Sequence, residues 1–253
     1  MECKCPSCQS TLVKKNGRTH NGKQNYRCLA CCRQFIQEPS QKIIDDKTKN
    51  LVRKTLLERV SLHGICRIFE VSMSWLLEFI DGLIQEIPQD LNAEVVEEDD
   101  EIEVVVLEAD ELWSYVGAKT NPQWLWLIMH SRTRQVVAME VGPRDRKTAE
   151  KLFFKLPESL KKKPSIILTT SLCTPMSSLT NNIDPSAKSL VKHLTLKDLT
   201  ARSDIERFNC TLRQRCSRLV RKTLSFSKKL INHIGMIAYF IADYNMCLRA
   251  LLV

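Results

Sequence analysis

The stretch from residue 104 to residue 113 reads Val-Val-Val-Leu-Glu-Ala-Asp-Glu-Leu-Trp, and it indicates the fold class of the longer part of the chain. Its first four residues form an apolar, β-branched run that is typical of a buried strand. Three carboxylates follow at the end of this strand, and strand alternation sends Glu108 and Asp110 to one face and Glu111 to the other. Carboxylates at the edge of a hydrophobic sheet are unfavourable unless a cation satisfies them, and Mg²⁺ is the natural occupant of such an oxygen site. Acids at an exposed strand end remain the alternative.

Strands and helices are both expected on the C-terminal side of this stretch. Strand patterns occupy residues 124–128, 135–141 and 165–168, and helical spacing of apolar residues occupies 145–160, 205–220 and 226–252. This mixture predicts an α/β domain over residues 104–253. Residues 169–200 stand apart within it as an aberrant segment, because they are rich in Ser, Thr, Asn and Pro, show no clear period, and are long for a connection inside a compact domain.

The N-terminal side divides into three parts. Residues 89–103 centre on the acidic run 97–101 and are typical of a solvated linker. Residues 41–88 carry apolar residues at helical spacing, whereas residues 1–40 are rich in Cys, Lys and Gln with little helical period. We therefore expect two small modules in front of the α/β domain.

Residues 60–80 fit two short helices around a tight turn, the pattern of a helix-turn-helix. Either Ser72 or Ser74 can cap the second helix, which enters the major groove in such motifs. Its start, with Ser72, Ser74 and Trp75, is thus expected to contact DNA. The usual turn glycine is absent and Glu70 stands where it might sit, so an ordinary helical hairpin remains the alternative.

Two Cys-x-x-Cys pairs near the N-terminus predict a metal site. Cys5 and Cys8 form the first pair and Cys28 and Cys31 the second, separated by a 19-residue loop. Four thiolates at this spacing can surround one tetrahedral zinc ion, and the loop length suits a zinc ribbon. Cys3 and Cys32 are additional candidate ligands, and the alternatives are a redox pair or unrelated cysteines. The intervening loop is basic, with Lys14, Lys15, Arg18, Lys23 and Arg27.

The formal net charge of +9 favours a polyanionic partner, because cations that neutralise phosphates release condensed counterions. No apolar signal segment follows Met1, and charged and polar residues interrupt the apolar stretch 231–253. We therefore expect a cytoplasmic protein that does not enter a membrane.

The segment that begins at Ser203 carries a second acid of interest, Glu206. Ser203 and Glu206 have the spacing of a capping box at a helix start, which is one role for this acid. The helix that follows is densely basic and suits phosphate contacts, through Arg207, Arg213, Arg215, Arg218, Arg221 and Lys222.

Taken together, the order of these parts resembles transposases of the family typified by insertion sequence 1. The most specific matching runs are Glu108-x-Asp110-Glu111-Leu-Trp-Ser-Tyr-Val-Gly117 and Ile205-Glu206-Arg207-Phe-Asn209, the latter continuing to Lys228. The resemblance implies a ribonuclease-H-like mixed sheet with flanking helices and a D-D-E triad that binds two magnesium ions. It implies Asp110 as the first acid and Glu206 as the third, so the metal role of Glu206 competes with its capping role. The implied partners are double-stranded DNA of the element's terminal repeats and of the target, with a homo-oligomer in a synaptic complex at the nucleoid.

The second acid of the triad is missing. The family pattern places Thr-Asp after the fourth strand, but here Thr169 is followed by Thr170, and a hydroxyl cannot replace a carboxylate ligand. Asp184 and Asp198 lie farther along, and neither follows the strand directly. The mismatch ends abruptly before Ile205, as two compensating frameshifts or a small rearrangement would produce. We expect a transposase whose activity is impaired in this copy; a DNA-binding remnant or repressor of the same element is the alternative.

Overall fold

A computed structural model describes residues 3–19, 22–37, 44–94, 104–161, 165–170, 190–195, 203–220 and 226–252. The chain divides into two compact units, Met1–Asp46 and Lys47–Val253, and each is described by itself. The acidic run at 97–101, Asp184, Asp198, Arg221 and Lys222 lie outside the described residues.

The first unit is a small antiparallel sheet. Its strands are β1 (Val13–Arg18), β2 (Gln24–Cys28) and β3 (Gln34–Ile36), paired in the order β1-β2-β3. Tyr26 and Phe35 stack with ring centroids 5.9 Å apart, but the sheet buries few apolar side chains. A unit with so small a core needs another source of folding free energy, such as a metal.

The second unit begins with three helices, α1 (Asp46–Leu56), α2 (Leu62–Phe69) and α3 (Met73–Gln85). Ser61 caps α2 and Ser72 caps α3, each through its hydroxyl oxygen. Glu70 lies between them at φ 51° and ψ 39°, the left-handed conformation that a turn glycine would adopt. Ile65 and Leu76 are fully buried. Ile68, which has the helical spacing of a core residue, is instead 61% exposed.

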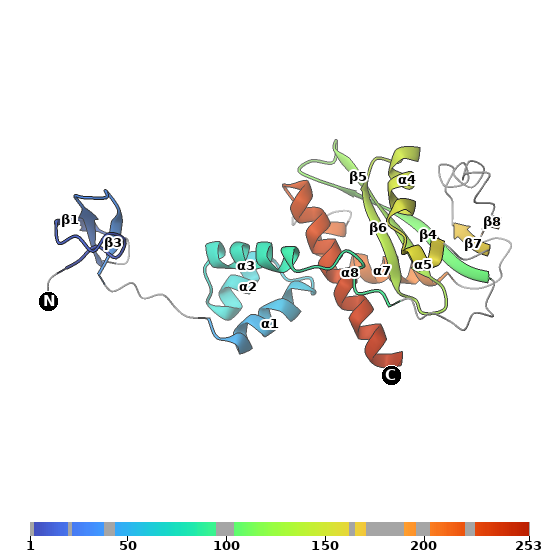
Figure 1. The fold of residues 1–253 in the computed structure, drawn as a ribbon, viewed down its shortest axis with the longest axis horizontal. Helices are drawn as coiled ribbons and strands as arrows, with labels where there is room; N and C mark the ends of the chain where they lie inside the picture. Colours follow the sequence, from blue (N-terminus) through green and yellow to red (C-terminus); the bar gives the residue numbers. More distant parts are fainter. Residues whose placement is uncertain are drawn as a thin grey trace. The chain divides into compact units, whose positions relative to one another are not determined.

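The remaining elements form a mixed sheet with flanking helices (Figure 1). The sheet has the order β6-β5-β4-β7-β8, with antiparallel pairing among the first three strands and parallel pairing of β7 and β8. Its strands are β4 (Val104–Tyr115), β5 (Pro122–His130), β6 (Val136–Gly142), β7 (Ser165–Thr170) and β8 (Leu190–Thr195). Its helices are α4 (Arg146–Phe154), α5 (Glu158–Lys161), α7 (Asp204–Arg215) and α8 (Leu230–Leu252), with the 3-10 turn η2 (Ser217–Leu219). The chain is therefore an α/β protein, as predicted.

Each face of this sheet has its own apolar core. Leu112, Leu125 and Leu127 lie in one core with residues of α7 and α8. Leu107, Trp126 and Ile128 lie in the other core with residues of α4. Successive residues of β4 thus alternate between the α7 side and the α4 side, as strand geometry requires.

Two features of the sheet differ from our expectations. The acidic residues 108, 110 and 111 lie in the middle of β4 and not at its end, because pairing with β5 carries the strand on to Tyr115. The segment 169–200, in which the sequence shows no clear period, contains the last residues of β7 and all of β8. Periodicity within the segment did not reveal β8.

Among the described residues, no helix combines the length and the apolar character that crossing a membrane requires.

Candidate functional site

The buried carboxylate of Glu108 ties β4 to the start of α7. Its Oε2 accepts hydrogen bonds from Ser203 Oγ and from the backbone N–H of Ile205, both at 3.0 Å. Its Oε1 accepts a third bond, from Ser131 Oγ at 3.2 Å. A negative charge at a helix N-terminus is favourable, because the first N–H groups of a helix have no partner within the helix. Glu108 therefore caps α7, although it lies 95 positions before Ser203 in the chain.

Asp110 lies on the same face of β4 and meets α7 one turn farther along. Asn209 Nδ2 donates to Asp110 Oδ2 at 2.6 Å. Glu206 precedes Asn209 by three residues, a spacing that puts both side chains on neighbouring positions of one helix side. The structure thus brings the strand of Asp110 and the helix of Glu206 together.

The capping box predicted at Ser203 is formed only in part. Ser203 Oγ accepts the backbone N–H of Glu206 at 3.3 Å, which is the expected cap. Within the described part of the chain, no donor to the Glu206 carboxylate is found, and that side chain is exposed. Glu108 and Ser203 accept the hydrogen bonds at the start of α7. The Glu206 carboxylate is therefore not needed as a cap, and a capping role does not compete with a metal role for it.

Glu111 points to the opposite face, as strand alternation predicts. Its carboxylate pairs with Arg144, whose Nε lies 3.0 Å from Glu111 Oε1, and only 5% of the Glu111 side chain is exposed. Arg144 also lies over the Trp124 ring, 5.0 Å from the centroid. Glu111 therefore belongs to an ion pair on the α4 side and is separate from Asp110.

The parallel strand β7 ends beside this acidic part of β4. In the register of the two strands Thr170 is paired with Ala109, the residue before Asp110. The backbone of the position where we expect the second acid is therefore level with the residue before Asp110, and Ala109 itself belongs to the core on the α4 side.

The arginines of the α7 region differ in their surroundings. Arg207 is exposed and Arg213 is half-buried. Arg215 is held within the unit by an ion pair with Glu58 at 2.8 Å and lies over the Phe240 ring. Arg218 donates from Nη1 to Ser227 Oγ and to the carbonyl of Asn232, both at 2.9 Å, so it connects η2 to the start of α8.

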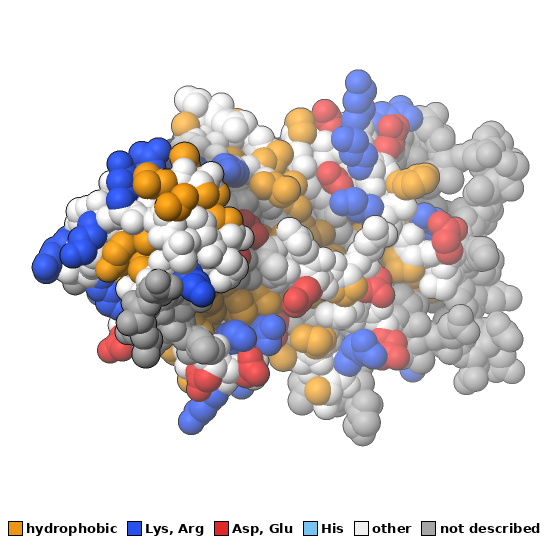
Figure 2. Space-filling model, turned by 60° about the vertical axis from the view of Figure 1, so that its left-hand side comes forward, with side chains coloured by type: hydrophobic (Ala, Val, Ile, Leu, Met, Phe, Trp, Pro, Cys, Tyr) orange, Lys and Arg blue, Asp and Glu red, His pale blue; other side chains and the backbone are white. Residues whose placement is uncertain are grey.

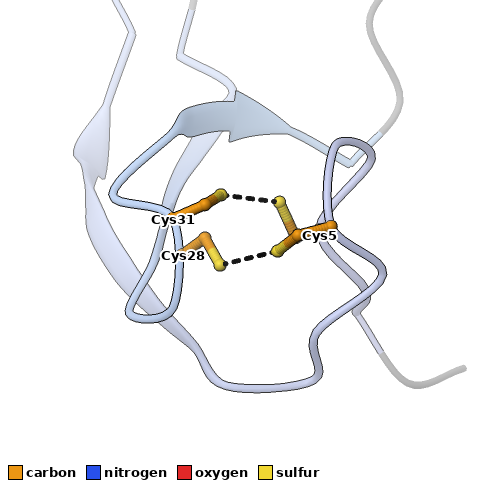
Figure 3. Close-up of side chains that lie close together, drawn as sticks. Cys5, Cys28 and Cys31 are labelled. Atoms are coloured by element: carbon orange, nitrogen blue, oxygen red, sulfur yellow. Dashed lines mark hydrogen bonds between the residues drawn. The ribbon is translucent and has the colours of Figure 1, made fainter.

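A second cluster lies in the first unit, where the four predicted cysteines converge. Figure 3 labels three of them, Cys5, Cys28 and Cys31, with their sulfurs turned toward a common centre. The sulfurs of Cys5, Cys8, Cys28 and Cys31 all lie within 4.8 Å of one another, and the cysteines are free. Tetrahedral zinc–thiolate bonds of about 2.3 Å imply sulfur separations of roughly 3.8 Å, which this cluster matches. The cluster could therefore hold zinc, whereas Cys3 and Cys32 are not part of it.

The surface of the first unit is basic. Figure 2 shows Lys and Arg side chains on the face of the first unit that is turned toward the viewer. The side chains of Lys14, Lys15, Arg18 and Arg27 are exposed. The α3 helix is different, because its exposed side carries Glu78 and Asp81 and the helix contains neither Lys nor Arg. At its start, Ser72 Oγ caps Trp75 N at 3.2 Å, Ser74 is exposed, and Trp75 stacks on Phe79.

Sequence reasoning missed two residues of the acidic site. Asn209 was quoted only as part of a motif, although its spacing from Glu206 could have marked it as a neighbour on the same helix side. The capping role of Glu108 had no local signal, since its partners Ser131 and Ser203 are distant in the chain.

Comparisons with known proteins match the second unit. The family described as IS1 transposase matches residues 103–246, which begin just before β4 and end within α8. The first unit and the three helices α1, α2 and α3 lie outside this match.

Individual relatives agree with the family match. The chain is 37% identical over 145 residues to insertion element iso-IS1n protein InsB of Shigella dysenteriae, which covers 55% of this chain and 96% of that protein. It is 34% identical over 143 residues to insertion element IS1 protein InsB of Shigella sonnei, covering 54% and 95%. It is also 34% identical over 143 residues to insertion element IS1 9 protein InsB of Escherichia coli (strain K12), covering 54% and 74%.

Proposed function

The chain belongs to the IS1 transposase family, and from this premise we propose how it acts on DNA. It binds the terminal repeats of its insertion element, and its cleavage and joining site consists of Asp110 and Glu206. Activity in this copy is impaired because Thr170 stands where the second acid belongs. The observation that carries the proposal is the hydrogen bond of 2.6 Å from Asn209 to Asp110, which joins the strand of one acid to the helix of the other.

The arrangement of the second unit supports a ribonuclease-H-like fold for residues 104–253. Three antiparallel strands followed by two parallel strands, with helices on both faces, put β4 at the centre of the sheet. Residues 1–40 are then a zinc ribbon with Cys5, Cys8, Cys28 and Cys31 as ligands, residues 41–88 a helix-turn-helix, and residues 89–103 a linker.

The residues near Asp110 fit a divalent cation by their chemistry. Asp110 and Glu206 offer carboxylate oxygens, and the buried Oδ1 of Asn209 has no hydrogen-bond partner among the described residues. Hard oxygen donors of this kind are the ligands that Mg²⁺ prefers. Bound magnesium would activate a water or a 3′-hydroxyl and stabilise the leaving oxygen. The protein orients the two acids through the Glu108 cap and the Asn209 bond.

Basic residues supply the contacts to DNA in this proposal. Arg207, which is exposed on the same helix as Glu206, is the first candidate for a phosphate contact next to the acids, and Arg213, Arg215 and Arg218 follow along the chain. Arg221 and Lys222 extend this set beyond the described residues. We place base contacts at the start of α3, at Ser74 and Trp75 with Ser72 as the cap. Contacts farther along α3 are disfavoured because Glu78 and Asp81 repel phosphates.

A DNA-binding remnant or repressor of the same element is the second candidate function. The observation that favours it is that β7 ends beside β4 with Thr170, a residue without a carboxylate, where the family pattern has an acid. Electrostatic stabilisation of charge dominates catalysis at such sites, so the loss of one acid removes most activity. For the active transposase, the proposal includes a homo-oligomer that holds the ends of the element in a synaptic complex.

Strand cleavage of terminal-repeat DNA in Mg²⁺ tests the proposal, with binding measured in parallel by gel shift. We expect the native chain to bind end DNA and to cleave it slowly, and Thr170→Asp to increase cleavage at least tenfold. Asp110→Asn in the Thr170→Asp background should abolish that gain, whereas Glu111→Gln, a neighbouring acid on the other face, should preserve it. End binding without cleavage in any variant supports the remnant, and cleavage that survives Asp110→Asn overturns the assignment of the acids.

The coding DNA gives a second test of the impairment. Its other two reading frames over residues 169–200 are expected to encode the Thr-Asp pattern of intact copies. Intact, active relatives that carry the same Thr170 segment would contradict the impairment.

A further inference from the structure

Asn209 has an unusual environment for a polar side chain. Only 5% of it is exposed, and its Nδ2 donates to Asp110 Oδ2. Its Oδ1 is buried and lacks a hydrogen-bond partner among the described residues. Buried polar atoms without a partner are rare, and each one requires an explanation such as a bound water or ion.

The orientation of the Asn209 amide follows from the charge of Asp110. An ionised carboxylate only accepts hydrogen bonds, so the Asn209 NH₂ group must face it. The amide oxygen is bonded to the same carbon as that nitrogen, so the hydrogen bond keeps it close to the Asp110 carboxylate. Glu206, one turn earlier on α7, brings a second carboxylate to this side of the helix.

The neighbouring donors are already used. The hydroxyls of Ser131 and Ser203 both donate to Glu108, at 3.2 and 3.0 Å. On the other side of Asn209 the helix buries Ile205, Phe208 and Leu212, which have no polar side-chain atoms. Two carboxylates and an amide oxygen thus form a group of acceptors, and a group of acceptors is stabilised by a cation.

We propose that Asn209 Oδ1 is a direct ligand of the divalent cation held by Asp110 and Glu206, an inference that rests on the proposed function. The α7 helix then supplies two ligands, from residues 206 and 209, and β4 supplies one. Asn209 occupies a coordination position that would otherwise need water, but it brings no charge. Cation binding by this chain therefore persists without an acid at position 170, at a lower negative charge than a site with three acids.

Substitutions that change the charge at position 209 can distinguish a ligand role of Asn209 from a structural role. In Asn209→Leu the site loses one oxygen and the Asp110 carboxylate loses the hydrogen bond from Asn209 Nδ2, so the cation is bound more weakly. In Asn209→Asp the oxygen is kept and a negative charge is added, so the cation is bound more tightly although repulsion from Asp110 destabilises the metal-free protein. A purely structural asparagine would be impaired by both changes in the same direction.

Mn²⁺ binding measured without DNA tests this, with the free-ion electron paramagnetic resonance signal of the zinc-loaded full chain as the readout. We expect Asn209→Leu to weaken Mn²⁺ binding about tenfold or more, the range found when residues supporting a metal site are changed. Asn209→Asp should strengthen it, and Asp110→Asn and Glu206→Gln should weaken it. Glu111→Gln and Gln214→Leu, an exposed position on α7, are the matched controls and should leave it unchanged.

The outcomes separate the two proposals. Unchanged Mn²⁺ binding in Asn209→Leu, with weaker binding in Asp110→Asn, overturns the ligand role and leaves the two-acid site in place. Unchanged binding in both Asp110→Asn and Glu206→Gln overturns the proposed cation site itself. Should Asn209→Leu not fold, as a thermal melt in chelator would reveal, Asn209→Asp decides, because weaker Mn²⁺ binding in that variant also overturns the ligand role.

Discussion

Replacing Glu108 is the sharpest test of how the acidic site is held together. The carboxylate accepts three hydrogen bonds, and the backbone N–H of Ile205 is one of the donors. Hydrogen bonds to a charged group contribute about 1.5–3 kcal/mol each and neutral ones about 0.5–1.5 kcal/mol. Gln can keep all three contacts, with its oxygen toward α7 and its NH₂ group toward Ser131. We expect Glu108→Gln to lower the free energy of unfolding by about 1–2 kcal/mol, since avoiding a buried charge offsets part of the loss.

Glu108→Ala should cost considerably more. It removes all three bonds and leaves the buried Ile205 N–H without a partner, so we expect a loss of about 4 kcal/mol. Urea unfolding of the zinc-loaded protein, followed by far-ultraviolet circular dichroism, measures both variants. Glu140→Ala is the control, because Glu140 lies on β6 in a partly exposed ion pair with Lys155, which contributes at most about 1 kcal/mol. If Glu108→Ala costs no more than Glu140→Ala, Glu108 does not fix the start of α7.

Three further predictions concern other parts of the chain. Metal removal by a chelator, or Cys28→Ser, should unfold the first unit and leave the sheet of the second unit folded, because metal binding supplies the folding free energy of so small a unit. Circular dichroism with a zinc assay measures this, and a ribbon that stays folded without metal would contradict it. Burial, followed by the charge of Arg218, lowers the pKa of the His233 imidazole from its ordinary value of 6.5 to about 4, so between these pH values the unfolded chain binds more protons. The contribution of neutral His233 to the free energy of unfolding should be fully present above pH 6.5 and decrease by up to about 3 kcal/mol toward pH 4. In urea unfolding, His233→Gln should show a shallower dependence of this free energy on pH than the native chain, and equal slopes would refute the assignment. Glu70→Gly should raise stability by about 0.5–1 kcal/mol, because Glu70 lies at φ 51° where glycine has no Cβ strain, and a lower melting temperature would argue against this reasoning.

Several features were accessible from local patterns. The spacing of Cys5, Cys8, Cys28 and Cys31 indicated one cluster, since two short knuckles joined by a hairpin-length loop can bring four sulfurs together. The position of Glu70 where a turn glycine is usual likewise agreed with its left-handed backbone. Both depend on residues near one another in the chain, which is the range over which sequence patterns carry information.

Strand alternation determined which carboxylates share a face, but not what they contact. The separation of Asp110 from Glu111 followed from the period of two, and the pairing of Glu111 with Arg144 on the α4 side agrees with it. The length of β4 did not follow, because pairing with β5 continues the strand past its apolar run through residues 108–111, which are individually poor strand formers.

The amino-acid sequence alone therefore determined the α/β class, the cysteine cluster and the faces of β4, because each follows from a period or a spacing within one segment. Only the tertiary structure decided that Glu108 caps α7, that Asn209 holds Asp110, and that β7 ends beside Ala109. These contacts depend on which strand lies next to which and on where a helix docks on the sheet. That choice is made by the burial of two apolar cores at once, a property of the whole folded unit that no local pattern contains.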